Sequence, residues 1–94
     1  MPPVEIECRT LDEGGQAGAE RPSRIMLDNM GLETMRQALA IIPAGIETEV
    51  SGGVDQDALA AIAALGPDFV SVGRITHSAK SADFSMLLEE TTTA

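Results

Sequence analysis

Apolar and polar positions alternate along the chain in four repeats of similar length. Each repeat begins with a short run rich in Val, Ile, Leu or Met, at residues 4–7, 25–28, 48–51 and 69–73. The runs stop at Glu7, Asp28, Ser51 and Gly73, which lie 21 to 23 residues apart. That distance accommodates one strand, one loop, one helix and one return loop. The pattern therefore predicts four strands, each followed by a connection to the next.

Two of the connecting segments are typical of helices. Residues 32–42 repeat apolar side chains at helical spacing, namely Leu32, Met35, Leu39 and Ile42. Residues 55–65 open with an aspartate that can cap a helix, continue with alanines and stop before a Gly-Pro pair. We expect both segments to be helical.

The remaining segments predict weaker structure. Residues 11–20 contain Gly14, Gly15 and Gly18, and each glycine costs about 1 kcal/mol relative to alanine inside a helix. The helix there is expected to be short or frayed. After Gly73 the pattern predicts a polar turn over residues 75–80, an extended run over residues 84–88 and a frayed tail over residues 89–94.

Strands that alternate with helices indicate an α/β fold with a parallel sheet, either doubly wound or closed as a barrel. A complete (β/α)8 barrel takes roughly 250 residues, so about four β/α units in 94 residues correspond to half of one. Half a barrel leaves two parallel edge strands without partners. The chain is therefore expected to be part of a TIM-like barrel with a terminal strand.

The amino-acid composition limits the kinds of molecule that the chain is expected to bind. Six basic residues stand against fifteen acidic ones, for a net charge of −9, which argues against nucleic acid as a partner. No apolar run is long enough to cross a bilayer, and the acidic start does not resemble a signal peptide. The lone Cys8 excludes a disulfide framework within the chain and is expected to be a buried structural thiol. We expect a cytoplasmic protein that binds neither nucleic acid nor membrane.

Candidate chemistry gathers where the predicted strands end, because parallel α/β folds bind ligands at the carboxyl ends of their strands. Ser51-Gly52-Gly53 runs from a strand into a helix, where glycines and free N–H groups can cradle a phosphate. An ordinary turn is the alternative reading. Val72-Gly73 at the next strand end favours the phosphate cradle, because barrels often use consecutive late loops for this purpose.

Two carboxylates, Glu7 and Asp28, end the first two strands. They could bind Mg²⁺ or ribose hydroxyls; the alternative is that they cap helices or remain solvated. Glu5 shares a sheet face with Glu7, and Glu49 shares one with Ser51. Inward carboxylates need partners, and we expect basic groups outside this chain to supply them. An anionic substrate would need the same groups.

His77, in the segment Gly73-Arg74-Ile75-Thr76-His77-Ser78, is favoured as a binding or positioning residue over a catalytic base. At this point the ordered motifs resemble a known family. They are Val4-Glu5-Ile6-Glu7, Ile25-Met26-Leu27-Asp28-Asn29-Met30, Glu49-Val50-Ser51-Gly52-Gly53, Val70-Ser71-Val72-Gly73-Arg74-Ile75-Thr76-His77-Ser78 and Ala82-Asp83-Phe84-Ser85. In order and spacing they are similar to the closing motifs of quinolinate phosphoribosyltransferases.

The resemblance implies Mg²⁺-dependent transfer of phosphoribose from phosphoribosyl pyrophosphate to quinolinate, with formation of nicotinate mononucleotide, CO2 and pyrophosphate in NAD biosynthesis. It implies that Glu7 and Asp28 are catalytic carboxylates that contact the ribose and metal region. The implied substrate- and phosphate-binding residues are Ser51, Gly52, Gly53, Val72, Gly73, Arg74 and His77. It also implies a homodimer of the full-length protein.

The family's basic cluster comes from an N-terminal domain and early barrel strands. Residues 1–94 are therefore expected to form the C-terminal half of the barrel domain, and to be inactive in isolation. Two alternatives remain open. One is a non-catalytic or split-enzyme half-barrel completed by another chain; the other is the related molybdenum-transport-associated protein of the same architecture.

Overall fold

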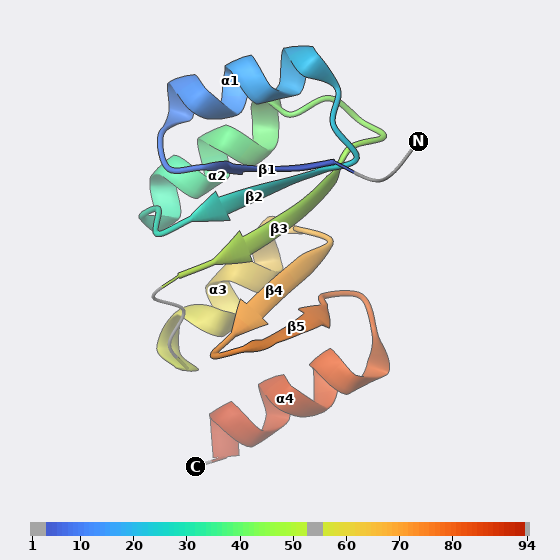
Figure 1. Ribbon diagram of the computed structural model, residues 1–94. Helices are drawn as coiled ribbons and strands as arrows, with labels where there is room; N and C mark the ends of the chain where they lie inside the picture. Colours follow the sequence, from blue (N-terminus) through green and yellow to red (C-terminus); the bar gives the residue numbers. More distant parts are fainter. Residues whose placement is uncertain (1–3, 53–55, 94) are drawn as a thin grey trace.

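The computed structural model describes residues 4–52 and 56–93. Strands and helices alternate along these ranges up to β4, which β5 follows directly (Figure 1). They are β1 (Glu5–Cys8), α1 (Leu11–Glu20), β2 (Arg24–Asp28), α2 (Leu32–Ile41), β3 (Glu47–Ser51), α3 (Gln56–Leu65), β4 (Phe69–Val72), β5 (Ile75–Ser78) and α4 (Ala82–Thr93). The four strands predicted from the apolar runs are confirmed, as are the helices predicted over residues 32–42 and 55–65. The predicted cap at Asp55 lies outside the described residues.

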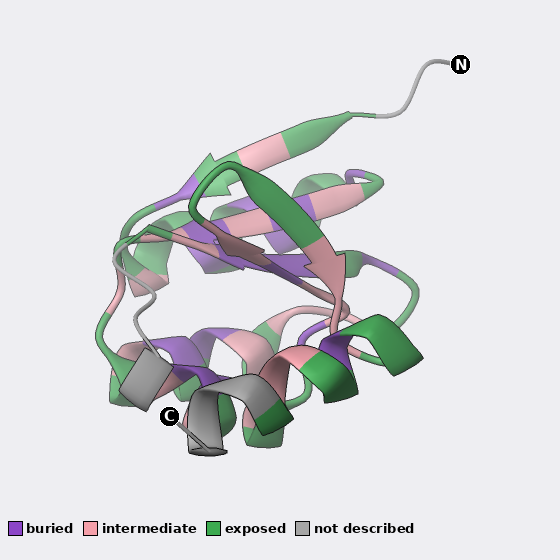
Figure 2. Cartoon of the chain, turned by 90° about the horizontal axis from the view of Figure 1, so that it is seen from below, coloured by how far each residue is buried: buried purple, intermediate pink, exposed green. Residues whose placement is uncertain are grey.

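The strands form a sheet in the order β1-β2-β3-β4-β5. The first four are parallel, and β5 runs antiparallel to β4. The strand order never reverses, whereas a doubly wound sheet has a reversal point. Right-handed crossovers between successive parallel strands place their helices on the same face, and the helices lie on one side of the sheet (Figure 2). The predicted α/β class is confirmed.

The core lies between this helix-covered face and the helices. Every second strand residue points into it, as the alternation of side chains along a strand requires. The buried apolar residues are Cys8, Ala17, Ile25, Leu27, Met35, Ala38, Ile46, Val50, Leu59, Ile62, Val70 and Phe84. Among the helices of the described residues, none combines the length and the hydropathy that a bilayer span requires.

Helix α1 is neither short nor frayed, so that prediction is wrong. It has ten residues, as α2 and α3 do. Thr10 caps its first turn by accepting a hydrogen bond from the Glu13 amide at 3.2 Å. Its glycines face α2 and the segment just after it: a Cβ atom on Gly14 would lie 4.0 Å from Ala38 Cβ, and one on Gly18 would lie 3.0 Å from Pro43 Cδ. Close packing of the two helices offsets the low helix propensity of glycine.

The prediction of a polar turn over residues 75–80 is wrong for residues 75–78 and confirmed for residues 79–80. Residues Ile75–Ser78 form β5, which pairs with β4 through a tight turn at Gly73, where φ is +65°. The pairing places Thr76 opposite Ser71, and their hydroxyl oxygens lie 2.9 Å apart. Cross-strand hydroxyl contacts of this kind stabilise a strand whose sequence is polar.

The extended run predicted over residues 84–88 is instead part of α4, which continues to Thr93 through the predicted tail. Ser81 begins the helix: its hydroxyl oxygen accepts from the Phe84 amide at 3.2 Å. Phe84 is only 2% exposed, and Leu87 and Leu88 pack against the core. The spacing i, i+3, i+4 suits a helix, but a five-residue apolar window does not separate helix from strand.

Candidate functional site

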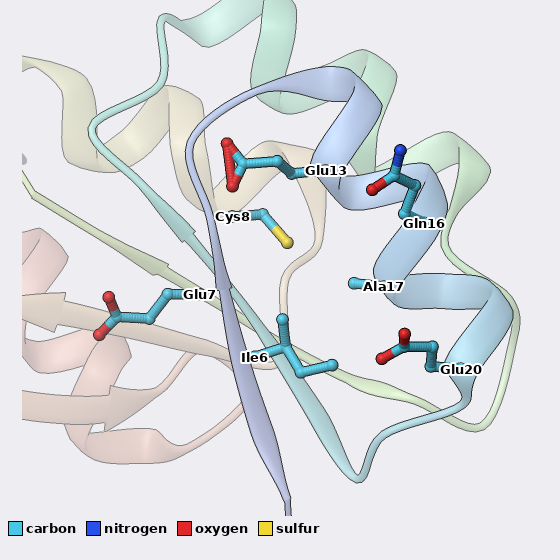
Figure 3. Close-up of a pocket in the computed structure, with 7 residues that line it drawn as sticks. All are labelled: Ile6, Glu7, Cys8, Glu13, Gln16, Ala17 and Glu20. Carbon is cyan, nitrogen blue, oxygen red and sulfur yellow. The ribbon is translucent and has the colours of Figure 1, made fainter.

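The sheet has a second face, opposite the helices, which we call the polar face. Figure 3 shows Glu7 pointing away from α1, whereas its neighbours Ile6 and Cys8 point toward it. The strand register and the alternation of side chains then assign the remaining strands. The polar face carries Glu5, Glu7, Arg24, Met26, Asp28, Glu47, Glu49, Ser51, Phe69, Ser71, Thr76 and Ser78.

The edge where β1 to β4 end, the carboxyl edge, brings several predicted residues together. Asp28 ends β2 and pairs in register with Ser51, which ends β3. Glu7 is the penultimate residue of β1 and is exposed. Val72 ends β4, and Gly73 follows it. Gly53 lies outside the described residues.

Asp28 and Gly52 are packed against each other at this edge. A Cβ atom on Gly52 would lie 2.5 Å from Asp28 Oδ1 and 2.9 Å from the Asn29 amide nitrogen. Gly52 also has φ of +81°, a conformation that side-chain-bearing residues rarely adopt. The Asn29 amide donates to the Ser51 carbonyl at 2.9 Å. The loops after β2 and β3 are therefore joined where phosphate binding was predicted.

Arg9 joins this group from the loop after β1. Its Nε lies 3.3 Å from Asp28 Oδ2, and the two side chains are 72% and 24% exposed. The Asp28 carboxylate thus has one oxygen beside Gly52 and the other beside a guanidinium. Arg9 was not identified from the sequence, although its position directly after a strand end was a usable signal.

Arg74 and His77 occupy different places. Arg74 is exposed in the turn between β4 and β5, at the carboxyl edge. His77 pairs with Val70, which is fully buried on the helix-covered face. Directly opposed residues of an antiparallel pair share a face, so His77 lies on the other face from Ser71 and Thr76. The structure does not group His77 with Asp28 and Gly52.

The opposite edge of the sheet, the amino edge, holds a second charged group centred on Arg24. Its guanidinium donates to Glu49 at 3.1 Å and to Glu47 at 3.3 Å, and it lies 3.9 Å from the centre of the Phe69 ring. Glu49, only 4% exposed, also accepts from the Ser71 hydroxyl at 2.9 Å. The expectation that inward carboxylates depend on basic groups outside the chain is therefore wrong for Glu49.

Glu5 lies beside this group on the first strand. Burial raises the pKa of its carboxyl, and the nearby Glu49 raises that pKa further, while Arg24 acts in the opposite direction. The sequence could have placed Arg24 on the same sheet face as Asp28, because side chains alternate between the two faces along a strand and Arg24 lies four residues before Asp28.

Asp68 forms a third polar group at the amino edge, just before β4. Its Oδ2 accepts from the Thr48 amide at 2.9 Å, and its Oδ1 accepts from Lys80 Nζ at 3.2 Å. Burial acts to raise the pKa of Asp68, but hydrogen bonds from Thr48 and Lys80 outweigh it and lower that pKa. Asp68 ties β3, β4 and the segment after β5 together, which is a stabilising role.

The described residues include three cavities, one beside β1 and two at the amino edge. One, of about 230 Å³, lies between β1 and α1 and is lined by Ile6, Glu7, Cys8, Glu13, Gln16, Ala17 and Glu20 (Figure 3). The other two lie at the amino edge, around Arg24 and Asp68. Cys8 is fully buried, as expected, and burial together with Glu13 raises the pKa of its thiol. The first cavity reaches the carboxyl end of β1, where Glu7 and Cys8 line it.

The comparisons with known proteins agree with the sequence motifs at the carboxyl edge. The model of the family described as "Quinolinate phosphoribosyl transferase, C-terminal domain" matches residues 1–87. The chain belongs to this family. The match includes all strands of the sheet and each residue of the carboxyl edge described above.

Individual relatives carry the corresponding enzyme name. A probable nicotinate-nucleotide pyrophosphorylase [carboxylating] of Bacillus subtilis (strain 168) is 39% identical over 83 residues, which is 88% of this chain and 29% of that protein. The nicotinate-nucleotide pyrophosphorylase [carboxylating] of Homo sapiens is 32% identical over 88 residues, which is 90% of this chain and 30% of that protein. The chain thus spans under a third of the length of these relatives.

A solved structure also resembles the fold. The nicotinate-nucleotide pyrophosphorylase from Francisella tularensis matches with a TM-score of 0.68 and 38% identity, over 80% of this chain and 28% of that one. The quinolinate phosphoribosyl transferase family therefore accounts for both the sequence motifs and the arrangement of strands and helices in this domain.

Metal binding can be tested against the side chains of this family member. Within residues 4–52 and 56–93, no group of three or more His, Cys, Asp or Glu side chains is placed to hold a metal ion. Mg²⁺ commonly uses only one or two carboxylates together with waters and substrate phosphates. Glu7 and Asp28 are carboxylates at the carboxyl edge, the residue type that such a site uses.

Proposed function

We propose that this chain forms the phosphoribosyl-binding half of a quinolinate phosphoribosyltransferase barrel. The reaction is the formation of nicotinate mononucleotide, CO2 and pyrophosphate from quinolinate and phosphoribosyl pyrophosphate. The observation that carries the proposal is the carboxyl edge, where Asp28 and Gly52 meet beside Ser51, with Glu7 near the end of β1 and Gly73 directly after β4. The names of the relatives support it over the molybdenum-transport-associated alternative.

The half-barrel is supported by the winding of the sheet. Four parallel strands follow in chain order with the helices on one side (Figure 2), as successive units of a (β/α)8 barrel do. In such a barrel the polar face points inward. That face carries charged and polar side chains such as Arg24 and Glu49, which pair with each other.

Five residues of the carboxyl edge have a chemical role in the proposal. Backbone N–H groups at Ser51, Gly52 and Gly73 bind the 5′-phosphate and fix the sugar in place. Glu7 and Asp28 stabilise the positive charge that develops on the ribose ring as pyrophosphate leaves. These two carboxylates would also bind Mg²⁺, which would neutralise charge on the pyrophosphate.

The proposal also explains why the isolated chain is expected to be inactive. Quinolinate and pyrophosphate are polyanions, and the chain has six basic residues against fifteen acidic ones. Arg24 and Lys80 are already paired with Glu47, Glu49 and Asp68. Arg9 and Arg74 are the described basic side chains at the carboxyl edge, so we expect further cations for these anions from other polypeptide. Quinolinate-dependent pyrophosphate release by the purified chain should be undetectable, and measurable turnover would contradict the proposal.

A chimera tests the function directly. Residues 1–87 would replace the matching segment of the Bacillus subtilis relative, so that this chain supplies the carboxyl edge and the host supplies the rest. We expect quinolinate-dependent pyrophosphate release, reduced at least about 100-fold by Asp28→Asn, because a charge that stabilises the transition state is lost. Glu33→Gln, on the exposed surface of α2, serves as the matched control. A folded but inactive chimera would count against the proposed function.

A second candidate is a half-barrel that is completed by another chain. It is favoured by the polar face, which the helices leave uncovered (Figure 2), and by the acidic balance of the chain, which suits a basic partner rather than a second copy. Co-expression with the remaining segment of the Bacillus subtilis relative distinguishes the two candidates, since only completion in trans restores activity without a covalent link. The homodimer implied by the family resemblance remains a prediction.

A further inference from the structure

Two basic side chains of the described residues, Arg9 and Arg74, lie at the carboxyl edge, and of these Arg9 contacts the carboxylate beside Gly52. Arg24 and Lys80 are paired at the amino edge, and Arg36 is paired with Glu33 on α2. Arg9 instead lies at the carboxyl edge, directly after β1, and its side chain is 72% exposed. A cation is therefore present at the surface where an anionic ligand is proposed to bind.

The contact between Arg9 and Asp28 connects this cation to the glycine loop. Arg9 Nε lies 3.3 Å from Asp28 Oδ2, while Asp28 Oδ1 occupies the space that a Cβ atom on Gly52 would need. The Asn29 amide, bonded to the Ser51 carbonyl, keeps the two loops together. A movement of Arg9 would therefore be transmitted to the Asp28 carboxylate and to the backbone beside it.

The charges of the two side chains explain how the contact between Arg9 and Asp28 could affect phosphate binding. A phosphate dianion bound at Ser51 and Gly52 would be repelled by the adjacent Asp28 carboxylate, at a cost that grows as water is excluded. Arg9 offsets that negative charge. A guanidinium also has five N–H donors in a planar fork that matches phosphate oxygens. With Nε directed at Asp28, the exposed side chain leaves other donors accessible to a ligand.

We propose that Arg9 is a positioning and phosphate-recognition residue: it holds the Asp28 carboxylate beside Gly52 and donates to the phosphate of a phosphoribosyl ligand. The inference rests on the proposed function, because it assumes that the carboxyl edge binds phosphate. The competing view is an ordinary surface ion pair. Such pairs contribute little to stability, and an ordinary pair would have no effect on ligand binding.

The test is a titration of the 94-residue chain with ribose 5-phosphate, followed through the amide NMR shifts of Asn29, Gly52 and Gly73. We expect Arg9→Gln to raise the apparent dissociation constant about tenfold, the effect of losing one charged hydrogen bond. The dissociation constant of Arg9→Lys should lie between those of the unmodified chain and Arg9→Gln, because lysine keeps the charge and lacks the planar fork. Arg36→Gln, which removes a cation from the surface of α2, should bind as the unmodified chain does.

A second ligand separates recognition of phosphate from a general structural effect. Ribose, which lacks the phosphate, should bind equally weakly to the chain and to Arg9→Gln. Equal affinity of Arg9→Gln and the unmodified chain for ribose 5-phosphate would overturn the role of Arg9 while leaving the proposed function intact. Absence of any shift in the folded, unmodified chain would overturn both.

Discussion

At the amino edge of the sheet, Arg24 contacts Glu47, Glu49 and Phe69, and Asp68 is bonded to Thr48 and Lys80. At the carboxyl edge, Arg9 contacts Asp28 while most of its side chain remains exposed. Charges at the amino edge are thus matched by partners within the chain, whereas those at the carboxyl edge remain accessible to a ligand. If the proposed barrel is correct, this division matches that of barrel enzymes, which separate stability and catalysis between their two ends.

The comparison predicts that Arg24→Ala has the largest effect on stability. It leaves the buried Glu49 carboxylate without its cation, and breaking a buried pair of this kind costs about 3 kcal/mol. Urea denaturation should show this loss, while the affinity of the remaining folded protein for ribose 5-phosphate stays unchanged. Arg36→Ala, which removes an exposed partner of Glu33, should leave the denaturation midpoint where it was. An Arg24→Ala protein as stable as the unmodified chain would contradict the conclusion that the charges of the amino edge stabilise the fold.

Gly52→Ala should affect both stability and binding. The new Cβ atom would overlap Asp28 Oδ1 and must adopt a positive φ, so we expect a loss of about 2 kcal/mol and no detectable binding of ribose 5-phosphate. Gly66→Ala is the matched control, because Gly66 has φ of +83° and open space around its Cβ position. It should cost about 1 kcal/mol and bind normally. Identical behaviour of the two variants would show that Asp28 does not crowd Gly52.

Asp68→Asn should have the smallest effect, about 1 kcal/mol at neutral pH, and should alter the pH dependence of unfolding. Because folding lowers the pKa of Asp68 from its ordinary value of 3.8, its contribution is present above that value and is lost as the pH falls through the folded-state pKa. The stability of the variant should therefore fall less steeply in this acidic range. Glu5, whose pKa is raised, contributes in the opposite sense, so Glu5→Gln serves as the contrasting control. Parallel pH profiles for Asp68→Asn and the unmodified chain would refute this account.

The elements that could be predicted from the sequence were those with a clear pattern of apolar residues within a few positions. The apolar runs ended close to residues such as Asp28 and Ser51, so strand positions and the shared carboxyl edge were predictable. Helix α1 was underestimated because the benefit of Gly14 and Gly18 depends on Ala38 and Pro43, which are distant in the sequence. The helix propensities of residues 11–20 do not take these distant contacts into account.

The candidate site was predictable in outline and not in its contacts. Glu7, Asp28, Gly52 and Gly73 were identified from their places at strand ends. The overlap of Asp28 with the Cβ position of Gly52 depends on strand register and on a positive φ, neither of which is visible in an apolar pattern. The Arg9 contact depends on a loop conformation for the same reason.

The glycine-lined contact between α1 and α2 has a consequence for how this domain assembles. A segment with three glycines in ten residues has little tendency to be helical as a free peptide. Its helix should therefore form together with its docking onto α2 rather than before it. Slow amide hydrogen exchange within α1 would then serve as a direct report that the two helices have come together.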